Sequence, residues 1–149
     1  MRALAVEPAG TWDRAGRRGQ VTLASDMRHR RRHAMRADEG FEFLLDLVHA
    51  AYLRDGDGLA LDDGGFVEVR AAPEPVMDVT CADPAHLARI AWHLGNRHLA
   101  VQVLPDGALR LLDDHVIAEM AEKLGAGVKR HVAPFEPEPG AYAGGAHGH

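Results

Sequence analysis

The sequence predicts an α+β protein built from two domains, and three observations support this prediction. Residues 1–72 hold short strand patterns separated by glycine- and aspartate-rich turns, which is typical of a small β-barrel or β-sandwich. Residues 71–75 contain two prolines and read as a stiff linker. After it, two helix patterns alternate with strand patterns. We therefore expect an all-β domain at residues 1–72, a mixed domain at 76–134 and a flexible tail at 135–149.

The first domain is expected to be a series of short strands. A turn is favoured at residues 54–58, because glycine adopts positive φ without strain. The sequence Asp-Asp-Gly-Gly at residues 62–65 lies between two apolar stretches and predicts a β-hairpin. The strand patterns occupy residues 20–24, 28–35, 41–45, 59–61 and 66–70.

The first helix of the second domain has clear start and stop signals. Asp83 suits the N-cap, and Pro84 suits the first turn. Apolar residues then follow at helical spacing over residues 87–94. Gly95 and Asn96 both suit a left-handed C-cap, so the helix is expected to end there.

The other elements of the second domain complete a β-α-β-β-α-β order. A second helix begins at Asp113 or Asp114, either of which can cap it, and Gly125 ends it. The strand patterns lie at residues 76–81, 98–104, 108–112 and 128–132. This order predicts a ferredoxin-like fold.

Composition excludes several classes of function. The formal charge of −5 argues against a general nucleic-acid binder, which needs a basic surface. The single cysteine, Cys81, excludes an internal disulfide and a cysteine-based zinc site. The apolar N-terminal stretch is interrupted by Glu7 and Pro8, and no stretch approaches the ~20 apolar residues of a membrane span. We therefore expect a cytoplasmic protein that does not bind membranes.

Ten histidines in 149 residues direct attention to metal binding. His93 falls in the last turn of the first helix, where a structural role bonded to carbonyl groups is the simpler interpretation. His98 follows the break at Gly95 and Asn96, at the mouth of the next strand. One imidazole is a poor site, but a twofold axis would bring a second copy opposite it. His98 is therefore a candidate metal ligand.

Further candidate ligands lie at a helix start and at the C-terminus. His115 follows Asp114 in a cluster that acts either as a helix cap or as an auxiliary metal site. His147 and His149, spaced by a glycine, form a loose set of imidazole donors. Imidazole suits nickel, zinc and copper. His49, His86 and His131 are interpreted as surface or packing residues.

Residues 28–33 form a basic segment with arginines at alternate positions, which share one face of a strand. Such a segment is usually a solvated edge strand, where charge discourages aggregation. The alternative is a basic face for an acidic partner protein. The N-terminal domain is therefore a candidate protein- or peptide-binding domain.

The motifs resemble those of the urease accessory protein UreE family of nickel metallochaperones. The most specific stretch is Ala-Trp-His-Leu-Gly-Asn-Arg-His at residues 91–98, with Asp83-Pro84 before it and Asp114-His115-Val116 after it. Weaker support comes from residues 53–57, 72–75 and 134–138. The resemblance covers most of the chain. It implies a β domain followed by a ferredoxin-like domain, and a homodimer formed by the second domain.

The resemblance also implies a function and roles for individual residues. It implies that His98 meets its copy across the dimer interface and binds Ni²⁺, which Zn²⁺ or Cu²⁺ can replace. His115 matches a second metal-associated histidine, and the tail, through His147 and His149, supplies further ligands. His93, Asn96, Arg97 and Asp114 are expected to support the site. The nickel would pass through the urease GTPase accessory protein to apo-urease.

Two departures from the family pattern limit these implications. The tail keeps only two histidines, which argues against high-capacity nickel storage. Asp113 stands where some relatives carry histidine, which weakens a second independent site.

Three other functions can be compared with these residues. A nucleic-acid module would stack bases on aromatic residues, and the expected strands of the second domain carry none. An acyl-phosphate hydrolase could use Asn96 and Arg97 as an anion clamp, but no matching loop follows the first strand. With no nucleophile–base constellation in the sequence, we expect no enzymatic activity. A general nickel, zinc or copper buffer or sensor without a urease client stays open.

Overall fold

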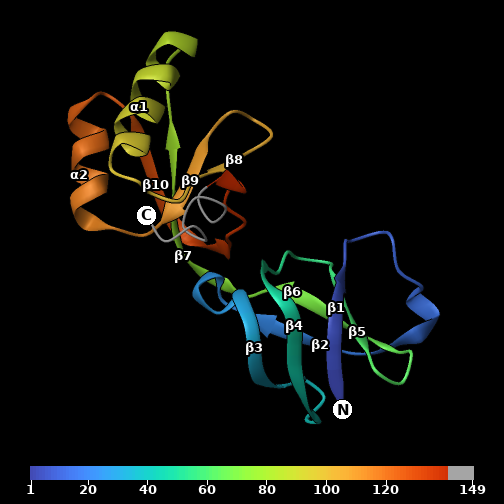
Figure 1. The fold of residues 1–149 in the computed structure, drawn as a ribbon. Helices are drawn as coiled ribbons and strands as arrows, with labels where there is room; N and C mark the ends of the chain where they lie inside the picture. Colours follow the sequence, from blue (N-terminus) through green and yellow to red (C-terminus); the bar gives the residue numbers. More distant parts are fainter. Residues whose placement is uncertain (141–149) are drawn as a thin grey trace. The chain divides into compact units, whose positions relative to one another are not determined.

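The computed structural model describes residues 1–140. The chain divides into two compact units, Met1–Ala72 and Pro73–His149. We call them the N-terminal unit and the C-terminal unit and describe each by itself. The architecture is α+β, with an all-β first unit and both α-helices in the second, as the sequence predicts (Figure 1).

The N-terminal unit is a curled six-stranded sheet with the order β2-β6-β5-β1-β4-β3. Two of its neighbouring pairs, β1 with β4 and β2 with β6, are parallel, and the others are antiparallel. Two short 3-10 helices, Arg14–Gly16 and Ser25–Met27, flank β2. The strands are β1 (Arg2–Glu7), β2 (Arg17–Leu23), β3 (His29–Arg36), β4 (Glu42–Tyr52), β5 (Gly58–Leu61) and β6 (Phe66–Ala71).

The core of this unit lies inside the curl of the sheet. Alternate residues of β4, including Phe43, Leu45 and Leu47, are buried together with Val67 and Val69 of β6. The predicted hairpin is present, because β5 and β6 pair antiparallel across the turn that contains Gly64 at φ 92°. Strand β1 was not predicted, although it lies between β4 and β5 and completes the sheet.

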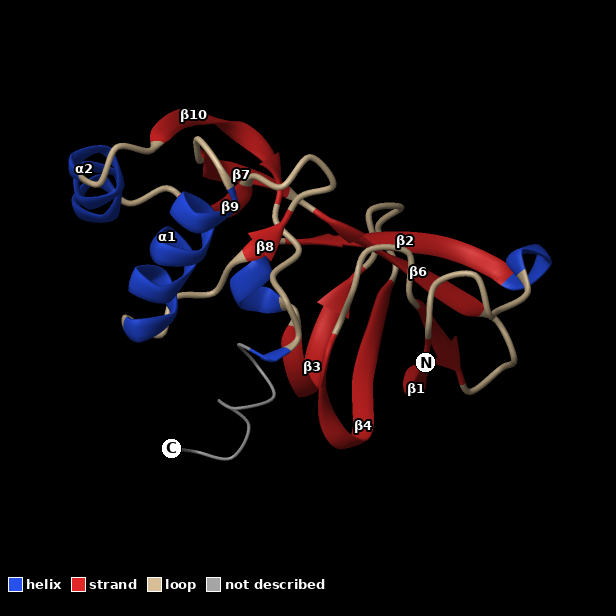
Figure 2. Ribbon diagram, turned by 90° about the horizontal axis from the view of Figure 1, so that it is seen from above, coloured by secondary structure: helices blue, strands red, loops and turns tan. Residues whose placement is uncertain are grey.

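The C-terminal unit has the ferredoxin-like fold that the sequence predicts. Its four-stranded sheet has the order β10-β7-β9-β8, and all neighbouring strands are antiparallel. The two helices pack on one side of this sheet (Figure 2). The elements are β7 (Pro73–Thr80), α1 (Pro84–Asn96), β8 (Gln102–Val103), β9 (Leu109–Leu112), α2 (His115–Lys123) and β10 (Gly127–Pro134).

The core of the C-terminal unit joins the helices to the sheet. Ile90 and Leu94 of α1 pack with Ile117 of α2 and with Met77 and Val79 of β7. These residues recur at helical spacing in α1 and at alternate positions in β7, which explains why the sequence pattern predicted both elements. Within residues 1–140, no helix combines the length and apolar composition needed to cross a bilayer.

Two expectations about the segments around this unit are wrong. Residues 71–75 do contain the boundary between the units, but they are not a stiff linker between elements, because β6 ends at Ala71 and β7 begins at Pro73. The two prolines of the segment, Pro73 and Pro75, lie in β7 and pair with Pro134 and Val132 of β10.

Residues 136–138, which the sequence assigned to the flexible tail, are bonded to residues 101–103. The backbone N–H of Glu138 donates to the carbonyl of Val101 at 2.8 Å. The Glu138 carboxylate in turn accepts from the N–H of Val103 at 3.1 Å. These bonds satisfy backbone groups beside the short strand β8, which gives the segment a fixed path that its composition did not indicate.

Candidate metal-binding site

Helix α1 ends in a Schellman motif, and this motif positions His98. The N–H of Leu99 donates to the carbonyl of Leu94 at 3.3 Å, and the N–H of His98 donates to that of Gly95 at 3.0 Å. These are the two bonds that define the motif. His98 takes its left-handed position, with φ 57°. Leu94 and Leu99 both pack in the core of the C-terminal unit, and this packing holds the turn against the core.

The helix ends at Asn96, as the sequence predicts, but the predicted left-handed cap was placed at the wrong residues. Gly95 and Asn96 are both helical, and the left-handed residue is His98. The apolar pair Leu94 and Leu99 determines the helix end, because the motif favours contact between the residues at these two positions. The expected strand at residues 98–104 is reduced to β8, Gln102–Val103, so His98 lies at a helix end and not at the mouth of a strand.

The side chain of His98 is exposed. Within residues 1–140 its imidazole makes no hydrogen bond or ion pair, so its ring nitrogens are not engaged by the described residues and one can bind a metal. The neighbouring Arg97 donates to the carbonyl of His93 at 3.3 Å, closing the last helical turn. Asn96 is exposed in the same turn. The backbone therefore fixes the position from which the His98 side chain projects. The exposed surroundings of the side chain leave its imidazole available to a metal ion.

His93 lies in the groove between the two helices. Its ring contacts Trp92 edge-on, with 5.0 Å between ring centroids. With Arg97 from α1 and Val116 and Met120 from α2, it lines an open hollow of about 360 Å³. His93 is thus half-buried beside an indole ring, while the predicted bond of its ring to a carbonyl group is not seen within residues 1–140.

Asp114, and not Asp113, caps α2. Its carboxylate accepts from the N–H groups of Val116 at 2.9 Å and Ile117 at 3.1 Å. Asp113 instead pairs with Arg130 at 2.7 Å. His115 is exposed, with its Nε2 4.0 Å from a carboxylate oxygen of Glu119. The capping interpretation of the cluster is confirmed, and it leaves the imidazole of His115 free to bind an ion.

His147 and His149 lie outside the described residues. Within the part that the structure describes, no three His, Cys, Asp or Glu side chains gather where they could hold a metal ion. His98 and His115 are therefore separate single donors in one chain. A site with several ligands would need donors from a second copy or from the C-terminal residues.

Two histidines interpreted as surface or packing residues do hold the unit together. The Nδ1 of His86 accepts from the N–H of Ala82 at 3.0 Å, so its Nε2 carries the proton that bonds the carbonyl of Leu124 at 2.8 Å. This ring ties the start of α1 to the end of α2. His131 lies 2.8 Å from Asp78, across the strand pair β7–β10.

Asp78 is the centre of a polar network that the sequence did not reveal. Arg110 donates to both of its carboxylate oxygens, at 2.7 and 2.9 Å. The hydrogen bonds from Arg110, and next that of His131, lower the pKa of Asp78 below its usual value. The network joins β7, β9 and β10 on the sheet face away from the helices. Its members come from three separate strands and lie far apart in the sequence, so no local motif indicates them.

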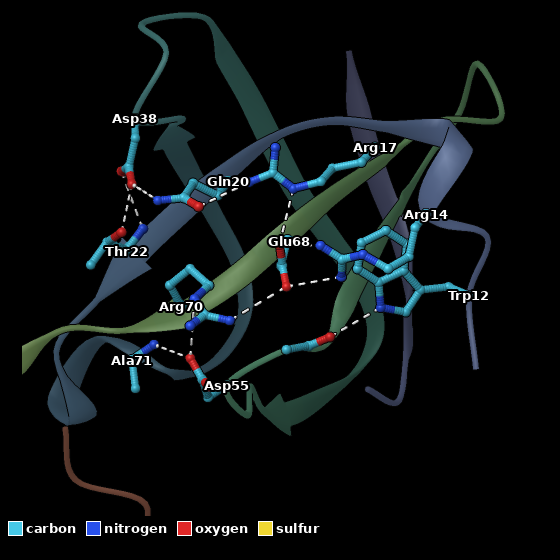
Figure 3. A network of polar contacts seen from close by, with 11 residues as sticks. Trp12, Arg14, Arg17, Gln20, Thr22, Asp38, Asp55, Glu68, Arg70 and Ala71 are labelled. Carbon is cyan, nitrogen blue, oxygen red and sulfur yellow. Dashed lines mark hydrogen bonds and ion pairs between the residues drawn. The ribbon is translucent and has the colours of Figure 1, made fainter. Parts of the chain in front are cut away.

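A second network stabilises the N-terminal unit around Glu68 (Figure 3). Arg14 donates to both of its carboxylate oxygens at 3.1 Å, and Arg17 donates to one of them at 3.0 Å. The guanidinium of Arg14 also lies 4.9 Å from the centre of the Trp12 ring. These bonds, with that of Arg14 the strongest cause, lower the pKa of Glu68 to about 2. The carboxylate is engaged by its own chain, so the cluster is structural.

Comparison with known families decides which family the two units belong to. The N-terminal domain of the urease accessory protein UreE matches residues 2–72, and the C-terminal domain of UreE matches residues 74–149. The chain belongs to the UreE family. The boundary between the two UreE domains falls where β6 gives way to β7, so His93, His98 and His115 all lie in the UreE C-terminal domain.

Individual UreE proteins are similar over most of this chain. The urease accessory protein UreE of Rhodopseudomonas palustris strain HaA2 is 56% identical over 123 residues, which are 83% of this chain and 57% of the relative. UreE of Bradyrhizobium sp. strain ORS 278 is 54% identical over 87% of this chain and 61% of its own length. UreE of Beijerinckia indica is 49% identical over the whole of this chain and 85% of the relative. The chain thus spans about three fifths of the first two relatives.

Proposed function

We propose that the protein is a nickel metallochaperone of urease maturation that works in the cytoplasm as a homodimer and catalyses no reaction itself. It would bind Ni²⁺ as cargo and pass it, through the urease GTPase accessory protein, to apo-urease. The observation that carries this proposal is the exposed imidazole of His98, fixed at the end of α1 in a UreE C-terminal domain.

A second copy of the chain would complete the site. In a twofold dimer each residue near the axis meets its own copy, so two His98 imidazoles would face each other. Exposed apolar side chains of the same unit support self-association, since Trp92 and Val116 are 64% and 69% exposed. Two imidazoles leave several coordination positions open, which suits an ion that must later be released.

Other residues have supporting parts in this proposal. His93, Asn96 and Arg97 belong to the helical turn that positions His98, and Asp114 fixes the start of α2 beside His115. His115, His147 and His149 would add ligands around the central pair. Imidazole donors also accept Zn²⁺ and Cu²⁺, so the selection of nickel would rest on geometry and availability.

The decisive experiment measures nickel binding by calorimetry and mass in solution by light scattering, on wild type and on His98→Asn. Asparagine tolerates the left-handed conformation better than most residues, so the variant removes the imidazole without straining the turn. We expect loss of the tightest nickel site with an unchanged circular dichroism spectrum. The matched control is His49→Asn, at an exposed histidine of β4. A His98→Asn protein that titrates like wild type would refute the interface site.

A nickel-transfer assay distinguishes a metallochaperone from a general metal buffer or sensor. Nickel-loaded wild type, incubated with apo-urease and its accessory proteins, is expected to raise urease activity above the level that free nickel at the same concentration gives. Equal activation by free nickel, with the His98 site intact, would favour the general metal buffer.

A further inference from the structure

Strand β3 forms one edge of the N-terminal sheet and is paired only with β4 among the described strands. Its register with β4 determines which of its backbone groups point outward. The N–H of Leu44 donates to the carbonyl of Met1 at 3.0 Å, toward β1 and away from β3. Ala34 lies opposite Leu44. In an antiparallel pair, opposite residues either bond each other or both point away. The N–H and carbonyl of Ala34 therefore point to the open edge.

The same reasoning extends along the strand in steps of two. Ala37 donates to the carbonyl of Phe41 at 2.8 Å, so this is a bonded pair and the next pair, Arg36 with Glu42, is not. The backbone groups of Arg32, Ala34 and Arg36 thus face the edge together. Their side chains share the outer face of the sheet, since the alternate residue Met35 is buried in the core.

On this outer face Arg32 lies opposite Asp46 of β4, and Arg36 lies opposite Glu42. Among the described residues, neither Arg32 nor Arg36 forms an ion pair, whereas Arg14, Arg17 and Arg70 share Glu68 and Arg18 pairs with Asp63. Asp46, opposite Arg32, is 3.6 Å from Arg2. Arg32 and Arg36 are both exposed. Among the described residues, the edge therefore presents two arginines that hold no ion pair, one on either side of a small residue and each opposite a carboxylate of β4.

The small residue opens onto a hollow lined by both apolar and charged residues. Ala34, Met1 and Leu44 contribute to the lining of an open depression of about 420 Å³, together with Arg36 and Glu42. A strand added beside β3 would place one side chain over Ala34 and the side chains two residues before and after it beside the arginines. The face thus fits an alternation of acidic, apolar and acidic side chains.

We propose that β3 is a docking edge for an extended acidic segment of a partner protein, which joins the sheet by backbone hydrogen bonds. Its recognition pattern is an acidic residue, any residue, an aliphatic residue, any residue and an acidic residue. A second copy of this chain does not fit. Antiparallel pairing of two β3 strands about Ala34 would place Arg32 opposite Arg36 and oppose like charges. The net charge of −5 disfavours nucleic acid as the occupant.

The first test uses the full chain and a short fluorescein-labelled peptide with Glu-Thr-Leu-Thr-Glu at its centre. Binding is measured by fluorescence anisotropy. The variant Arg32→Glu with Arg36→Glu is expected to weaken binding by roughly tenfold or more, because it places like charges beside the peptide. The control variant, Arg18→Glu with Arg89→Glu, changes the net charge by the same amount away from β3. It is expected to bind the peptide with the affinity of wild type. Equal loss in both variants, or no binding by wild type, overturns the proposal.

The second test separates strand addition from simple charge attraction. Two versions of the peptide carry N-methyl groups on alternate residues, on one backbone edge or on the other. Strand addition requires that one version loses binding and the other keeps it, because only one edge faces β3. Equal affinity of the two versions overturns it.

A single-stranded DNA of similar length is the competitor. Binding of this DNA as tight as that of the peptide, and lost with the same two arginines, would assign the edge to nucleic acid and overturn the proposal. The charge-reversed variant is also checked by circular dichroism and by its nickel titration. The nickel titration reports on the C-terminal unit, so it is expected to match that of wild type and to separate this result from that for His98.

Discussion

At the scale of single residues, the environment of Glu68 shows how one carboxylate can stabilise a sheet. Its side chain is 7% exposed and accepts hydrogen bonds from Arg14 and Arg17, while Arg70 lies within 3.5 Å. Arg14 begins the 3-10 helix that precedes β2 and Arg17 begins β2 itself, so Glu68 ties that end of β2 to β6. Its bonds to both residues depend on the negative charge of the carboxylate.

The pH dependence of stability follows from this charge. The pKa of Glu68 is lowered from 4.5 to about 2 in the folded protein, so its contribution is complete above pH 4.5 and disappears as the pH falls toward 2. Because Arg14 is itself 64% exposed, we reduce the contribution to about 2 kcal/mol at neutral pH. Glu68→Gln should lower the free energy of unfolding by this amount at pH 7 and by much less near pH 2.5. Urea unfolding at both pH values measures it, and an equal loss at both would contradict the assignment.

At the scale of elements, the start of α2 separates two adjacent aspartates that the sequence could not distinguish. Asp114 accepts two backbone N–H groups at the helix start, whereas Asp113 forms an exposed ion pair with Arg130. Asp114→Ala should cost about 1 kcal/mol of stability. Asp113→Ala should cost less than about 0.5 kcal/mol, because exposed ion pairs contribute little. Thermal unfolding of the two variants measures the difference in stability. Equal losses would show that the N-cap hydrogen bonds do not account for the contribution of Asp114.

The elements that the sequence predicted are those whose signals are local. Asp83 caps α1, Gly64 lies in the β5–β6 turn, and the apolar spacing of both helices leads into the core. Strand β1 was missed although Pro8 and Gly10 mark a turn directly after it, because its partners, β4 and β5, lie far along the chain. The end of α1 was predicted at Asn96, but its left-handed residue was missed, because the contact of Leu99 with Leu94 in the core places that residue at His98.

For the candidate site, sequence reasoning found the residues and not their geometry. His98 and His115 stood out by residue type and neighbours, and the structure places both at exposed helix ends. The left-handed backbone of His98 was not foreseen, since histidine is an unusual residue for that conformation. The exposure of Trp92 could have been found from the sequence, because it falls on the polar side of an otherwise regular helix pattern.

At the scale of the whole molecule, each unit has a core of its own. The residues of the two hydrophobic clusters do not overlap, and each sheet is complete within its unit. Residues 73–149, produced alone, should therefore fold with the circular dichroism of a mixed α/β domain. If the His98 site is as proposed, this fragment should bind nickel within about threefold of the affinity of the full chain. A folded fragment without nickel affinity would assign ligands to the N-terminal unit.

The turn at the end of α1 has a consequence for how a ligand can be handed over. His98 is positioned through its main chain. Its N–H bonds the carbonyl of Gly95, and Leu94 and Leu99 pack in the core next to the turn, whereas none of the described residues bonds its ring. The ring can therefore rotate about its own side-chain bonds while its anchor stays still. A donor mounted in this way can follow a departing ion for part of its path, so that exchange needs no opening of the fold.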